Sequence, residues 1–167
     1  MDILQLIKEE HVDLKGLLQA IDQEKSIVRK RRLTEELKAK VRFQLMMDED
    51  YLIPELSDRL PGLGEFQRSS GKSHKKIFRA VGDLNSIALK KSQESKLVLG
   101  TKQRQVTQML GEYLAKREDL LMPQIRQAIP TQDREDLGQV FADIRTDELG
   151  EFAPVFVRSS RPVALSV

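Results

Sequence analysis

Two histidines and two opposite charges, all at helical spacing, are the residues of this sequence whose types point to chemistry. His11 and His74 each fall on the apolar stripe of an expected helix, and Asp48 and Arg117 fall on the stripes of two others. Histidine and carboxylate side chains bind metal ions or exchange protons. The sequence has no cysteine, which excludes disulfides, thiolate metal ligands and thiol nucleophiles. With only two histidines, one chain cannot form a site of three imidazoles.

An internal repeat surrounds the two charged positions. Residues 44–54 read QLMMDEDYLIP and residues 113–123 read YLAKREDLLMP. Both segments fall at the same place in an expected helical hairpin, and each contains a proline that we expect to bend its helix. The positions identical in the two copies are Leu45/Leu114, Glu49/Glu118, Asp50/Asp119, Leu52/Leu121 and Pro54/Pro123.

This repeat resembles that of the hemerythrin-like (HHE cation-binding) family. The family carries a histidine in its first helix and another in its third. Its second and fourth helices each carry His-x-x-x-Glu, followed by a second Glu and by a Pro ten residues after the His. Residues four apart share one face of a helix, so each His and Glu point into the bundle together. The resemblance covers residues 1–145 and implies a four-helix bundle around a pair of irons.

The sequence departs from the family motif at the residues that would bind the metal. Gln44 and Asp48 stand at the His and Glu positions of the second helix, and Tyr113 and Arg117 stand at those of the fourth. Arg117 places a permanent cation where a ligand to a dication is expected. Because an isolated buried charge is very costly, we predict that Asp48 and Arg117 form an ion pair. Gln44, Tyr113 and both histidines would complete a polar network, whereas the alternative has Arg117 reaching solvent.

Metal binding remains as the alternative interpretation of this pocket. His11, Asp48 and His74 together make a two-histidine, one-carboxylate set of the kind that binds a single iron. Glu49 and Glu118 lie about 100° around their helices from the inner positions, so we expect them on a solvated face or behind the pocket residues. They are also candidates to swing in as substitute ligands. A third interpretation is a haem held between the two histidines.

Helical periodicity over most of the chain predicts the elements that position these residues. We expect an all-α fold, an up-down-up-down four-helix bundle with a short fifth helix and an extended C-terminal tail. A dimer of helical hairpins is the alternative. The first helix should end near Lys25 and the second should begin near Thr34, while Phe78 falls on the inner stripe of the third. The fifth should end near Ile144, which divides the chain into a bundle at 1–145 and a tail at 146–167.

Charge and hydropathy restrict the expected partners and location. The chain has 28 Lys and Arg against 26 Asp and Glu, a net charge of +2, which is too small to favour nucleic acid. The basic cluster at 29–32 is expected in a solvated loop between the first two helices. No apolar stretch is long enough for a membrane span, and the N-terminus lacks a signal-peptide pattern, so we expect a cytoplasmic protein. The apolar tail would pack on its own bundle, or dock on a protein partner or a second copy.

These observations favour a protein without enzymatic activity. The leading hypothesis is a hemerythrin-like domain that has lost the di-iron centre, holds no cofactor and acts as a binding or regulatory module. The alternative is residual iron binding through His11, His74 and Asp48, which would serve to sense oxygen, nitric oxide or iron.

Overall fold

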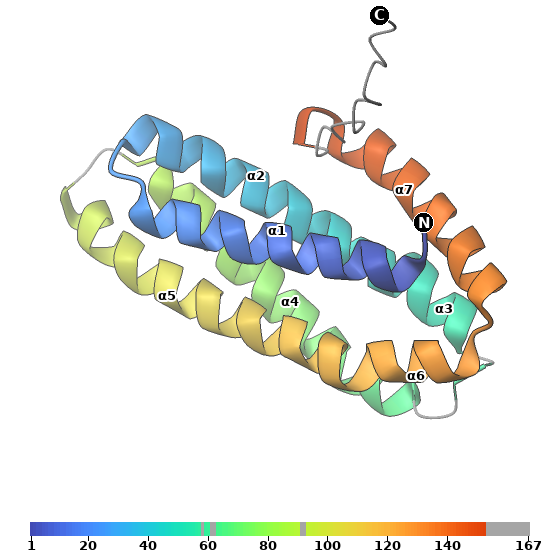
Figure 1. The fold of residues 1–167 in the computed structure, drawn as a ribbon. Helices are drawn as coiled ribbons and strands as arrows, with labels where there is room; N and C mark the ends of the chain where they lie inside the picture. Colours follow the sequence, from blue (N-terminus) through green and yellow to red (C-terminus); the bar gives the residue numbers. More distant parts are fainter. Residues whose placement is uncertain (58, 61–62, 91–92, 153–167) are drawn as a thin grey trace, which may run out of the picture.

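The computed structural model of this chain describes residues 1–57, 59–60, 63–90 and 93–152. Within these residues helices are joined by short turns without any strand, which confirms the expected all-α class (Figure 1). Four long helices lie side by side (Figure 1), with α1 packed against α2 and α5, and α4 packed against the same two helices. Their bounds are α1 (Ile3–Gln23), α2 (Ile27–Met46), α4 (Leu63–Ala88) and α5 (Gln93–Lys116).

Both repeat segments contain a π-helical stretch where a proline bend was expected. α2 continues through η1 (Met47–Leu52) into α3 (Ile53–Leu56), and α5 continues through η2 (Arg117–Leu121) into α6 (Met122–Ala128). At each junction the backbone N–H binds the carbonyl five residues earlier, from Ile53 to Asp48 and from Met122 to Arg117. Each proline sits in the first turn of the helix that follows. Proline lacks an amide hydrogen and its ring crowds the preceding turn, which the wider π turn accommodates.

The apolar core is divided by a layer of buried polar side chains. One cluster packs the first turns of α1 against η1, α3, α6 and α7, and the other packs the remainder of α1 against α2, α4 and α5. Between the clusters the inner faces carry polar residues instead of aliphatic ones. The layer comprises Glu10, His11, Gln44, Asp48, His74 and Arg117, each at most 7% exposed.

The basic cluster at 29–32 lies in the first turns of α2, so its expected place in a loop was wrong. The helix begins at Ile27, well before the expected start, because the side chain of Ser26 caps it. Arg31 donates from Nε to the carbonyl oxygen of Ala88 at 2.8 Å. That carbonyl belongs to the last turn of α4, where backbone acceptors have no partner within the helix. Arg31 thus fastens the start of α2 to the end of α4.

The last helix extends beyond its expected end. α7 (Thr131–Leu149) packs on α1 and α2, and η3 (Gly150–Phe152) follows it. The first residues of the expected tail are therefore helical, and the remainder, 153–167, lies outside the described residues. Gly138 of α7 lies against the backbone of the N-terminus, where an added Cβ would overlap the carbonyl oxygen of Met1.

One residue expected in the core lies on the surface. Phe78 is 43% exposed, because the inner face of α4 is formed by Ile77 and Val81 and the side chain of Phe78 points about 100° away from Ile77. Among the described helices, none is both long enough and apolar enough to cross a membrane.

Replacing Gly138 tests the close approach of α7 to the N-terminus. We expect Gly138→Ala to lower the free energy of unfolding by about 1–3 kcal/mol, because the new methyl group overlaps backbone atoms. Gly16→Ala is the matched control, since a Cβ there meets open space. The control should stabilise the protein by about 0.5–1 kcal/mol through helix propensity, and urea unfolding measures both. Equal effects of the two substitutions would contradict the packing described here.

Candidate functional site

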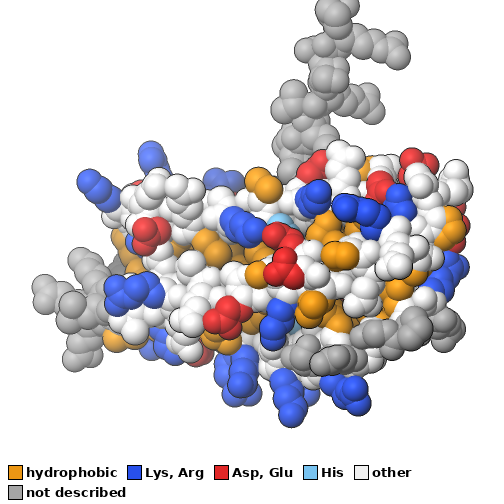
Figure 2. All heavy atoms as spheres, turned by 60° about the horizontal axis from the view of Figure 1, so that its bottom comes forward, with side chains coloured by type: hydrophobic (Ala, Val, Ile, Leu, Met, Phe, Trp, Pro, Cys, Tyr) orange, Lys and Arg blue, Asp and Glu red, His pale blue; other side chains and the backbone are white. Residues whose placement is uncertain are grey.

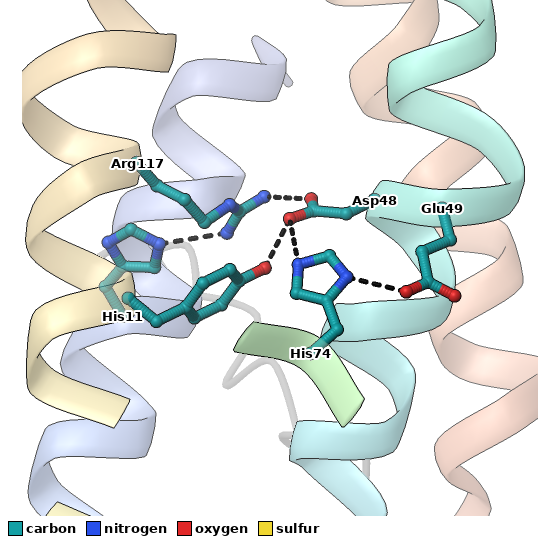
Figure 3. Close-up of polar contacts among 6 residues, drawn as sticks. His11, Asp48, Glu49, His74 and Arg117 are labelled. Carbon is teal, nitrogen blue, oxygen red and sulfur yellow. Dashed lines mark hydrogen bonds and ion pairs between the residues drawn. The ribbon is translucent and has the colours of Figure 1, made fainter. Parts of the chain in front are cut away.

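A buried ion pair between Arg117 and Asp48 is the centre of the polar layer (Figure 3). Arg117 Nη2 donates to Asp48 Oδ1 at 2.7 Å, and both side chains are 0% exposed. The two residues come from η2 and η1, the equivalent π-helical turns of the repeat. The predicted pair is therefore confirmed, and the alternative of Arg117 reaching solvent is wrong.

Tyr113 and Gln44 each form a further hydrogen bond to this pair. The hydroxyl of Tyr113 donates to Asp48 Oδ2, so both oxygens of the carboxylate are bonded. Burial raises the pKa of Tyr113 well above its usual range, which keeps the phenol protonated and able to donate. With its amide oxygen turned toward Arg117, Gln44 accepts from Nη2 at 2.9 Å and donates from Nε2 to Glu10 Oε2 at 2.8 Å.

His11 is a neutral imidazole that accepts a hydrogen bond from the second terminal nitrogen of the Arg117 guanidinium. Burial, followed by the charge of Arg117, lowers the pKa of His11 to about 4. The Nε2 lone pair accordingly accepts from Arg117 Nη1 at 2.9 Å, and Nδ1–H donates to Glu118 Oε1 at 2.7 Å. Glu118 is partly exposed and also accepts from Lys15 at 2.9 Å. One chain of bonds thus leads from the surface to the buried ion pair.

His74 repeats this arrangement on the other side of the site. Its Nδ1 lies 2.7 Å from Glu49 Oε1, the same separation as between His11 and Glu118 (Figure 3). In both cases the histidine of one hairpin meets the glutamate of the other. The imidazole ring of His74 packs edge-on against the ring of Tyr113, with the ring centroids 5.2 Å apart. Its Nε2 lies 3.9 Å from Asp48 Oδ2 and makes no hydrogen bond to the described part of the chain.

Glu10 also belongs to this network, although it lies outside the repeat and the motif positions that pointed to the other residues. Its side chain is buried, and burial raises the pKa of Glu10 to about 7. Arg145 Nε of α7 lies 3.5 Å from Glu10 Oε1, so the network reaches the last helix. The position of Glu10 in the sequence could have indicated that it is buried. It follows Leu6 by one helical turn, so the two residues share one buried face of α1.

The residues of this layer, as arranged, do not fit a metal ion. His11 Nε2 and Asp48 Oδ1 both face the guanidinium, and a cation occupies the space between them. Among the described residues no group of three or more His, Asp and Glu side chains is placed to hold a metal. The proposed ligands His11, Asp48 and His74 do lie in one layer, but Arg117 stands between His11 and Asp48 (Figure 3). Hydrogen bonds, several of them charge-assisted, join α1 and α4 to the two continuous helices formed by α2 with η1 and by α5 with η2.

Removing one member of the central ion pair should lower the free energy of unfolding more than removing both members together. Arg117→Met leaves the carboxylate of Asp48 buried without its cation, which typically lowers the free energy of unfolding by about 3–5 kcal/mol. Adding Asp48→Asn should recover part of that loss, with a coupling energy of about 1–3 kcal/mol in a double-mutant cycle followed by urea unfolding.

A surface pair serves as the control for this cycle. Lys102 Nζ and Asp83 Oδ2 lie 3.6 Å apart on partly exposed side chains. The cycle of Lys102→Met and Asp83→Asn should give a coupling of about 0–1 kcal/mol. Strictly additive effects at Arg117 and Asp48 would show that the two charges do not meet.

Two buried groups should give opposite dependences of stability on pH. The folded pKa of His11 is about 4 against 6.5, so its contribution to stability is lost as pH falls between those values. The folded pKa of Glu10 is about 7 against 4.5, so its contribution is greatest at low pH and is lost as pH rises between those values. Where the ranges overlap, the two slopes cancel in the wild type.

Single substitutions separate the two contributions. Relative to the wild type, Glu10→Gln should gain about 3 kcal/mol as pH rises from 4.5 to 7, and His11→Gln should lose about 3 kcal/mol between pH 4 and 6.5. Glutamine keeps a hydrogen-bonding amide at both positions. Urea unfolding across this pH range measures both differences, and parallel curves for the two variants would refute the assignment.

Comparison with known proteins identified no relative of this chain. No family model matches the sequence, and neither a curated protein nor a solved structure is found to match it.

Proposed function

We propose that this chain is a hemerythrin-like, up-down-up-down four-helix bundle in which a buried ion pair has taken the place of the di-iron centre. The proposal assigns it a role as a binding or regulatory module without enzymatic activity or cofactor. The resemblance of the repeat at 44–54 and 113–123 supports the family, and the side-by-side packing of α1, α2, α4 and α5 is compatible with it.

The proposal rests on the contacts of the Arg117 guanidinium with His11 and Asp48. Metal ligands offer lone pairs, and lone pairs are also hydrogen-bond acceptors. Arg117 donates to His11 Nε2 and to Asp48 Oδ1, which are the atoms that the resemblance would assign to a metal. A fixed organic cation therefore stands where a metal dication would stand, and it offers no site for substrate or oxygen to bind.

The two copies of the repeat explain how such an exchange can be accommodated. Asp48 and Arg117 occupy equivalent positions, so two helices related by the repeat present them to one another. Opposite charges at equivalent positions neutralise each other without a metal. Gln44 and Tyr113, also equivalent, hydrogen-bond to the pair.

Restoring the family motif tests this proposal. The variant Gln44→His, Asp48→Glu, Tyr113→His and Arg117→Glu recreates both His-x-x-x-Glu motifs beside the two native histidines. We expect it to bind about two irons per chain when purified without chelator, because four imidazoles and two carboxylates would then face one pocket. The parent should bind little iron under the same conditions, with metal content measured by mass spectrometry.

A matched control keeps Arg117 in place. The triple variant Gln44→His, Asp48→Glu and Tyr113→His adds ligands but retains the cation, so it should bind far less iron than the quadruple variant. Near-stoichiometric iron in the parent would refute the proposal. It would favour sensing or storage through a single metal held by His11, His74 and Asp48.

A further inference from the structure

The outer side of α4 carries a stripe of positive charge. Its spacing of three and four residues places five exposed cations on one face of the helix. No acidic residue interrupts these cations in the sequence. In the described part of the chain, none of the five cations forms an ion pair. Lys and Arg side chains project in a row along the lower edge of the face in Figure 2. The basic stripe comprises Arg68, Lys72, Lys75, Lys76 and Arg79.

The outer side of α7 carries the opposite charge. Its two arginines face inward, since Arg134 Nε lies 2.8 Å from Asp2 Oδ2 and Arg145 Nε lies 3.5 Å from Glu10 Oε1. The exposed charged residues of the described helix are therefore all acids. Asp133, in the first turn, pairs with Arg59. Within the described residues, the acids that follow it along the helix form no ion pair. The acidic stripe comprises Glu135, Asp136, Asp143 and Asp147.

The two stripes match in length and in character. At 1.5 Å per residue, the basic stripe spans about 16 Å and the acidic stripe about 18 Å. Each helix also exposes one large apolar side chain beside its stripe, Phe78 at 43% on α4 and Val140 at 50% on α7. The stripes do not meet within one molecule, because no ion pair joins them in the described structure. Each therefore lacks a counterpart of opposite charge.

We propose that the basic stripe of α4 docks on the acidic stripe of α7 in a second copy of this chain. The charge complementarity supports a second copy over a nucleic acid or a lipid surface, because the chain itself supplies an acidic helix of matching length. The contact is heterologous, with different faces meeting, so it closes into a ring or extends into an open chain. Exposed ion pairs are individually weak and screened by salt, so this self-association is weak and salt-sensitive.

Charge reversal on each helix tests the contact by complementation. One variant carries Lys72→Glu, Lys75→Glu and Arg79→Glu, and the other carries Glu135→Lys, Asp143→Lys and Asp147→Lys. Sedimentation at low salt should show self-association of the wild type that disappears at high salt. Each variant alone should associate at least about tenfold more weakly, because its two stripes then have the same sign. An equimolar mixture of the variants should restore association.

A control variant separates the stripe from net charge. Lys25→Glu, Arg29→Glu and Arg32→Glu change the net charge as much as the α4 variant does, on exposed residues near the start of α2. This control should associate like the wild type, and circular dichroism should be unchanged in all variants. A wild type that stays monomeric at low salt, or a mixture that fails to associate, overturns the proposal. Loss of binding to DNA or to anionic phospholipid vesicles by the α4 variant, with a monomeric wild type, would assign the stripe to another polyanion.

Discussion

The removal of two opposite charges from water is the constraint on which the interior of this protein depends. Asp48 and Arg117 are both completely buried, and the cost of dehydrating them is offset by their mutual attraction and by the hydrogen bonds that their charged groups make. Among the described residues, the neighbouring side chains supply a hydrogen bond to every polar atom of the two side chains except Arg117 Nε. Tyr113, Gln44 and His11 each bond to one or both members of the pair, and each comes from a different helix. A network of this kind favours one register of the helices over others.

The π-helical turns place this pair at the centre. Each turn contains one of the two charged residues and precedes a proline, so the same local distortion recurs in both repeat copies. π turns often occur at functional positions in helices. Here they carry Glu49 and Glu118 as well, whose carboxylates reach back to His74 and His11. The crossed contacts tie each hairpin to the other, which makes the site a structural junction.

Charged residues are distributed differently on the surface and in the interior. Inside, opposite charges are paired within a few ångströms, whereas on the outside the cations of α4 and the acids of α7 are segregated onto separate helices. A net charge of +2 conceals this segregation, because the sums of the two signs nearly cancel. Whole-chain charge therefore describes such a protein poorly. The distribution over individual helix faces is what governs its attraction to partners.

The helical class, most of the buried stripes and the central ion pair were predictable from the amino-acid sequence. The helical class and the buried stripes follow from periodicity within each helix. The ion pair follows from opposite charges at equivalent positions of the repeat, because an isolated buried charge is too costly. The π turns, the exposure of Phe78 and the link from Gln44 through Glu10 to Arg145 were not predictable in this way and became visible only in the folded chain. Contacts between helices depend on how each helix is rotated and shifted along its axis against its neighbours. That register is set by packing over the whole core, which no single segment of the sequence contains.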